Sequence, residues 1–320
     1  RQIVELGTGL YSTEWMPYRY AFGRGLAKGT LDYQATWKEL VQELQRLGAK
    51  NFNFAVFSGF IEEIENQDRA KAQALLDHCL DDPLLRTAIV GLHPTRVFDE
   101  KDLDRCLSAL TYPEVTGWMY GDLIWRKEYA SLPNPRGHDL AMRLLQEPNG
   151  DGIVLDALSM KLHGTKSADD TLGAEYRRIG LVAATSRLLR SQDDPGGSTD
   201  HAMKQVVGAA LSFAGNEEEK TAWLDAIFSV VDGSYGYMHA FDDAIQVTAE
   251  KLPATFLDRV FSGDAEEQKR RRFFIERGGV DKLPLGTVDI DTLIDWCRTK
   301  AVPDTWPVVA ASILQWAIKK

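Results

Sequence analysis

The feature of this sequence that most constrains its fold is an apolar period of about 3.6 residues. Five apolar residues follow the spacing i, i+3, i+4, i+7 and i+10, with charged and amide side chains between them: Trp37, Leu40, Val41, Leu44 and Leu47. One face of an amphipathic helix has this spacing, whereas a half-buried strand alternates at every second residue. Alternation is confined to short pieces, so we predict an all-α chain without a substantial sheet.

The same spacing predicts helices along most of the chain. We expect them at about 37–47, 52–66, 68–80, 83–92, 103–110, 118–123, 138–147, 152–163, 171–191, 200–214, 218–232, 239–251, 254–262, 264–277, 290–297 and 304–318.

Successive helices also fall into pairs at a loosely repeated interval. The last leucines of four first helices are separated by 36, 30 and 35 residues: Leu44, Leu80, Leu110 and Leu145. A small residue occupies one column of the second helices, where two helices would approach closely: Gly59, Gly91, Gly121 and Ala157. Stacked pairs of this kind contact only their neighbours, so we predict an irregular α-solenoid of HEAT- or TPR-like helix pairs. An irregular helical bundle with coincidental spacing is the alternative.

A polar stretch at 163–171 is the best candidate for a domain boundary, because beyond it the helices lengthen and the repeat interval is lost. We therefore expect a helical-repeat region at 1–165. Residues 166–320 form either a second helical region or a divergent continuation of the repeats. The chain begins at Arg1 and shows no signal-peptide pattern, which favours an interior piece of a longer polypeptide.

Composition narrows the classes of partner. The net charge of −10 disfavours nucleic acid and anionic membrane surfaces, and no apolar run approaches the roughly 18 residues of a membrane span. The three cysteines, Cys79, Cys106 and Cys297, are an odd number at irregular spacings, which is typical of a reduced, cytoplasmic setting. We expect a cytoplasmic protein with a protein or peptide partner, and its oligomeric state stays open.

Motifs for cofactor chemistry are incomplete. In Gly23–Thr30, Lys28 precedes Gly29, whereas a phosphate-binding loop needs the lysine directly after its last glycine. No HExxH pair or CxxC occurs, so we predict neither a cofactor nor a metal. His138–Asp139, with His93 upstream, is the basis of an alternative, a helical metal-dependent phosphohydrolase-like enzyme. The simpler interpretation is that the dipeptide begins a helix, where Asp139 suits the helix dipole.

Two polar segments are candidates for contact with a partner. In the first, an aromatic loop at 233–237 precedes a histidine with aspartates three and four residues later, which places imidazole and carboxylates on one helical face. The second is the basic run at 269–272, which would bind phosphate or an acidic partner unless Glu266 and Glu267 pair with it along the helix. The candidates are Tyr235, Tyr237, His239, Asp242, Asp243, Lys269, Arg270, Arg271 and Arg272.

Three segments together carry a family resemblance: Phe22–Gly29 before Trp37, the Gly59–Ile61 column, and Ile290–Trp296 followed by Trp306–Trp316. The pattern resembles the helical-repeat tails of large bacterial multidomain proteins, including defence ATPases of the STAND type. Such a resemblance implies recognition of proteins or peptides through solenoid surfaces, with catalysis in a separate upstream domain. We therefore predict a noncatalytic protein-recognition or scaffold region of a larger protein. An oligomerisation module is a further alternative.

Overall fold

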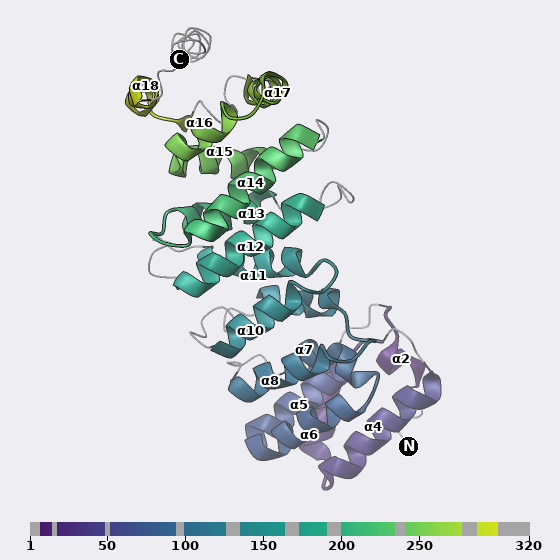
Figure 1. Ribbon diagram of the computed structural model, residues 1–320. Coiled ribbons are helices and arrows are strands. Elements are labelled where there is room, and N and C mark those ends of the chain that lie inside the picture. The colour runs from purple at the N-terminus through teal and green to yellow at the C-terminus, as the bar shows by residue number, and fades with distance from the viewer. Residues whose placement is uncertain are drawn as a thin grey trace. The chain divides into compact units, whose positions relative to one another are not determined.

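The computed structural model describes residues 7–14, 18–48, 52–93, 99–125, 135–163, 173–190, 200–233, 241–276 and 287–299. Every regular element within these ranges is a helix, which confirms the predicted all-α class (Figure 1). None of the helices in these ranges combines the length and the apolar content that a membrane span requires. The helix expected at 304–318 lies outside the described residues.

The chain divides into two compact units, Arg1–Pro148 and Asn149–Lys320. This division differs from the boundary at 165/166 that the polar stretch suggests. The reason lies in α11 (Gly150–Leu162), which packs against α12 (Ala174–Arg190) and α13 (Asp200–Leu211) and so belongs to the second unit.

The first unit is a succession of short and medium helices. Its elements are α2 (Thr8–Tyr11), α3 (Arg19–Gly29), α4 (Tyr33–Leu47), α5 (Ala55–Gln67), α6 (Arg69–Asp81), η1 (Leu85–Ala88), α7 (Ile89–Leu92), α8 (Glu100–Ala109), η2 (Gly117–Trp125) and α10 (Pro135–Leu144).

Two segments expected as α-helices are partly or wholly 3₁₀-helices. At 83–92 the carboxylate of Asp82 accepts the backbone amides of Leu84 and Leu85, and the Thr87 hydroxyl donates to the carbonyl of Leu84 at 2.6 Å. These local bonds favour a tight 3₁₀ turn, η1, before α7 begins. In η2, Tyr120 is fully buried and donates to the Cys106 carbonyl at 2.5 Å. The apolar period does not distinguish these tight turns from α-helix.

The helix α4 follows the sequence pattern at both ends and along its buried face. Asp32 caps its start by accepting the backbone amides of Gln34 and Ala35, and Gly48 ends it in the left-handed conformation with φ 60°. Trp37 is buried as predicted, and its ring centroid lies 5.2 Å from that of Phe57 on α5. The capped helix is thus fixed to α5 through aromatic contacts.

The glycine column marks a close approach of two helices at Gly59. A Cβ atom at Gly59 would lie 2.1 Å from the backbone oxygen of Tyr20, and one at Gly23 would lie 2.0 Å from that of Val56. The close approach is therefore between α5 and α3. At Gly121 an added Cβ would meet nothing within 4 Å, so the column does not mark a helix crossing at every position.

Within the first unit, α4, α6, α8 and α10 contact one another in sequence and run in the same direction. Contacts join corresponding positions of neighbouring members: Gln45 with Asp82, Arg69 with Asp99, Asp77 with Arg105, and Asp104 with Arg136. Between α6 and α8, for example, the starts meet at Arg69–Asp99 and later positions meet at Asp77–Arg105, as in a row of parallel helices.

The second unit repeats this next-but-one packing with longer helices. Its remaining elements are α14 (Glu217–Gly233), α15 (Asp242–Lys251), α16 (Pro253–Val260), α17 (Ala265–Glu276) and α18 (Ile290–Thr299). Helix α11 packs on α13 and α13 on α15, while α12 packs on α14 and α14 on α16. On α13 and α15, Lys204 meets Asp243 at 3.2 Å and Gly208 lies against Val247, both at a separation of 39 residues. These two helices are therefore also parallel.

Candidate functional site

The sequence-predicted interaction residues of the second unit do not come together as one exposed site in the described part of the chain. Tyr235, Tyr237 and His239 lie outside the described residues. Asp242 and Asp243 lie in the first turn of α15, where the helix dipole stabilises their carboxylates. Asp243 is half-buried and forms an ion pair with Lys204 of α13. Its described contact therefore stabilises helix packing.

The basic run on α17 divides between the surface and the interior. Arg271 is buried, and its guanidinium donates to both oxygens of the Asp232 carboxylate on α14 and to the backbone carbonyls of Arg259 and Ser262. The pairing with Glu267 expected from sequence is replaced by this contact with Asp232. Arg271 thus joins α17 to α14 and α16.

The other three members of the run differ in environment. Lys269 is exposed and lies 3.9 Å from Glu266, and Arg270 is half-buried. Arg272 belongs to α17, but its side chain is outside the described set. Glu266 contacts Lys269, three residues later, and not Arg270, four residues later, as the sequence predicted.

The His138–Asp139 dipeptide lies in the second turn of α10. Asp139 is exposed and sits 3.8 Å from Arg136 on the same helix, while His138 is half-buried. Across the described ranges, no group of three or more His, Cys, Asp or Glu side chains is arranged to hold a metal ion. The described contact of Asp139 is therefore with its own helix, and the described residues do not supply a set of metal ligands around the dipeptide.

His93 belongs to a buried ionic cluster. Its Nε2 lies 3.3 Å from the Asp102 carboxylate, and its Nδ1 is 2.7 Å from the Ile89 carbonyl. Arg105 bridges Asp102 and Asp77 at 3.0 and 2.7 Å. Burial opposes ionisation of Asp102, but the hydrogen bond and charge of His93 and the charge of Arg105 lower its pKa to about 2. The cluster connects α6, α7 and α8.

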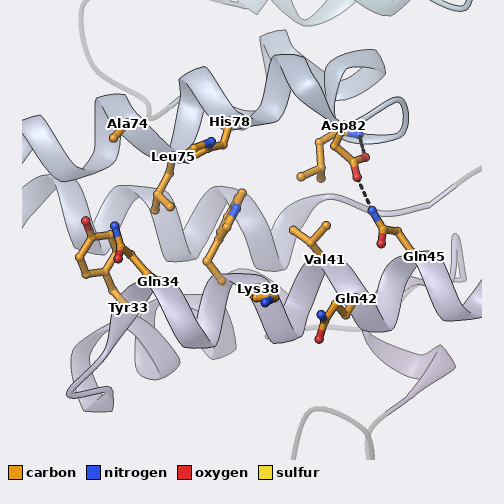
Figure 2. Close-up of a pocket in the computed structure, with 12 residues that line it drawn as sticks. Tyr33, Gln34, Lys38, Val41, Gln42, Gln45, Ala74, Leu75, His78 and Asp82 are labelled. Atoms are coloured by element: carbon orange, nitrogen blue, oxygen red, sulfur yellow. Dashed lines mark hydrogen bonds between the residues drawn. The ribbon is translucent and has the colours of Figure 1, made fainter.

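The described feature best suited to a ligand is a groove of about 570 Å³ between α4 and α6 (Figure 2). A volume of this size lies within the range of small-ligand and peptide sites. Figure 2 shows Ala74, Leu75, His78 and Asp82 along one wall and Tyr33, Lys38, Val41 and Gln45 along the other.

Both ends of the groove are joined by side-chain contacts. At one end the Gln45 amide donates to the Asp82 carboxylate at 2.6 Å, as the dashed line in Figure 2 marks. At the other end the Lys71 ammonium lies 5.5 Å from the centroid of the Tyr33 ring. From Lys71 to Asp82 the groove follows three turns of α6, which is about 17 Å at 1.5 Å per residue. About five residues of extended chain would span this length.

The walls combine an apolar floor with a polar rim. Trp37 and Leu75 are 6% and 3% exposed, and Val41 is half-buried. The rim on α4 is formed by Gln34, Lys38 and Gln42, which are exposed and spaced by one helical turn. The arrangement can bury an apolar group while it offers amide and ammonium donors along one side.

The sequence contains a signal for this groove that the search for motifs missed. The apolar face of α4 is wide, because it holds Leu40 and Leu44, which are completely buried, and Trp37 and Val41 beside them, which line the groove. Val41, predicted as part of the buried stripe, keeps part of its surface accessible in the groove.

These features define an all-helical protein of two units, the first of which carries a peptide-sized amphipathic groove between parallel helices. Comparisons with models of protein families, with curated proteins and with solved structures gave no match.

Proposed function

We propose that this chain is a noncatalytic protein-recognition or scaffold region that binds a peptide segment of its partner in the groove between α4 and α6. The observation that carries the proposal is the groove itself, whose apolar floor includes the half-buried Val41 and whose ends are joined by Gln45–Asp82 and Lys71–Tyr33. Binding in such grooves depends on buried apolar anchors surrounded by polar contacts.

Within this proposal each unit is a stack of helix pairs, an irregular α-solenoid. Support comes from the next-but-one packing of α11 with α13 and α13 with α15, and from the parallel row α4, α6, α8 and α10. Stacks of this kind expose long helical faces on which partners bind. The resemblance to helical-repeat tails of STAND-type defence ATPases extends the proposal to a place within a larger multidomain protein in the cytoplasm.

The test is affinity purification of partners with matched variants of the full chain. Val41→Glu places a charge on the groove floor, and Leu31→Glu makes the same kind of change at a fully exposed site outside the groove. We expect a partner that binds the wild-type chain and the Leu31→Glu variant but not Val41→Glu. A set of bound proteins unaffected by Val41→Glu would refute the proposal.

The enzymatic alternative has its own test. If the chain is a helical metal-dependent phosphohydrolase, phosphoester turnover should depend on added metal and disappear in Asp139→Ala. The recognition proposal expects no such turnover. The oligomerisation alternative predicts concentration-dependent self-association in light scattering, which Val41→Glu would leave unchanged if another surface is responsible.

A further inference from the structure

The charged groups that line the groove differ in whether they are already engaged. One oxygen of the Asp82 carboxylate accepts the backbone amides of Leu84 and Leu85 at 2.9 and 3.0 Å, and the other accepts the Gln45 amide. Its charge is thus used to cap the turn after α6. His78 lies 3.8 Å from the Asp81 carboxylate on its own helix.

Lys38 is the cation left for a ligand. It is exposed on the rim of α4, and no residue in the described ranges forms an ion pair with it. Gln34 and Gln42 lie one turn before and one turn after it on the same rim. Lys38 therefore presents an ammonium flanked by two amides, which suits a carboxylate and the peptide groups beside it.

The apolar floor lies next to this ammonium. Lys38 and Val41 are three residues apart on α4, which places their Cβ atoms about 5–6 Å from each other. A ligand that uses both needs an apolar side chain and a carboxylate at a similar spacing. In an extended peptide, residues i and i+2 point to one side about 7 Å apart, so the matching pattern is a large apolar residue, any residue, and then Asp or Glu.

We propose that the groove binds an acidic-apolar peptide segment of about five residues, whose apolar side chain covers Val41 and whose carboxylate pairs with Lys38. The inference rests on the proposed function and adds the chemistry of the ligand to it. The partner is a protein that exposes such a segment. The net charge of −10 would otherwise attract basic segments, but the positive charge of Lys38 disfavours them in the groove and favours the acidic one.

The experiment is selection of a phage-displayed library of random 12-residue peptides on the full chain, with binding of enriched peptides measured by fluorescence polarisation. Four proteins are compared: wild type, Val41→Glu, Lys38→Glu, and Lys101→Glu as a control that reverses an exposed lysine on α8. Thermal unfolding of each variant establishes that it is folded.

We expect enriched peptides with Asp or Glu two residues from a large apolar residue. Their affinity should fall about tenfold in Lys38→Glu, toward the upper limit for loss and reversal of an exposed ion pair. It should be unchanged in Lys101→Glu. A peptide in which the acid is replaced by lysine should bind Lys38→Glu better than it binds the wild-type chain, which a merely structural role of Lys38 would not produce.

Two results would count against the inference in different ways. Peptides that need Val41 but show no acidic preference, or no response to Lys38→Glu, would overturn the ligand chemistry and leave the proposed function in place. If no peptide binding depends on Val41, the proposed function itself fails together with the inference.

Discussion

The crossing of α3 and α5 makes a sharp prediction, because each helix places a glycine against a backbone oxygen of the other. In Gly59→Ala the new Cβ would lie 2.1 Å from the Tyr20 oxygen, whereas ordinary contacts of Cβ begin near 3.4 Å. The helices must therefore separate by about 1 Å or more. Overpacking of this kind costs about 1–3 kcal/mol, and contact with rigid backbone places Gly59→Ala at the upper end. The higher helix propensity of alanine offsets about 1 kcal/mol of this cost, so we expect the free energy of unfolding to fall by about 2 kcal/mol.

Gly25→Ala on α3 is the matched control, because an added Cβ there meets nothing within 4 Å. This variant should gain only the higher helix propensity of alanine, so its free energy of unfolding should rise by about 1 kcal/mol. The two substitutions are chemically identical and have opposite expected signs. Thermal and urea unfolding followed by far-UV circular dichroism measures both, with an expected drop of roughly 6–8 °C in the first unit's transition for Gly59→Ala. Equal or stabilising effects of both substitutions would show that α3 and α5 do not cross at these glycines.

Three further predictions test the interior of each unit. The lowered pKa of Asp102 means that its contribution to stability is present above the unfolded value of about 4 and is lost as pH falls toward about 2. In Asp102→Asn the melting temperature should therefore fall less between pH 6 and pH 2 than it does in the wild-type chain. The same pH dependence in both proteins would show that Asp102 does not form the buried ionic cluster. Arg271→Ala should cost about 3 kcal/mol in urea unfolding because it leaves Asp232 without its partner, whereas Lys269→Ala on the same helix should change stability by less than about 0.5 kcal/mol. Burial raises the pKa of the Cys79 thiol, so in the native chain it should react with a thiol reagent far more slowly than after denaturation; rapid labelling of native Cys79 would refute its burial.

Helix positions were the most predictable part of the fold, because the apolar period records which face each helix buries. The helix expected at 68–80 is Arg69–Asp81, and the one expected at 152–163 is Gly150–Leu162. The tight turns at Leu85–Ala88 and Gly117–Trp125 were mistaken for α-helix. Side-chain to backbone bonds such as that of Thr87 decide these turns, and they leave the apolar spacing almost unchanged.

The candidate site was less predictable, because a groove depends on which neighbour leaves a face uncovered. The wide apolar face of α4 indicates an additional surface, but the local sequence does not show that Val41 lines the groove while Leu40 is completely buried. The basic run shows the same limit. Arg271 appeared paired along its own helix, but its partner Asp232 lies 39 residues earlier in the chain. Tertiary contacts of this kind override the i,i+4 pattern.

The range of the contacts between helices has a consequence for how each unit opens. Four side-chain pairs between helices join residues 28 to 39 positions apart, roughly one helix pair along the chain: Gln45–Asp82, Asp77–Arg105, Lys204–Asp243 and Asp232–Arg271. Where cooperativity is transmitted only between adjacent pairs, the terminal pairs can unfold while the middle of the unit stays folded. Backbone amides should then exchange with solvent in a graded series, fastest in the outermost helices and slowest in the central ones. The chain would thus lose and regain order in steps of about one helix pair.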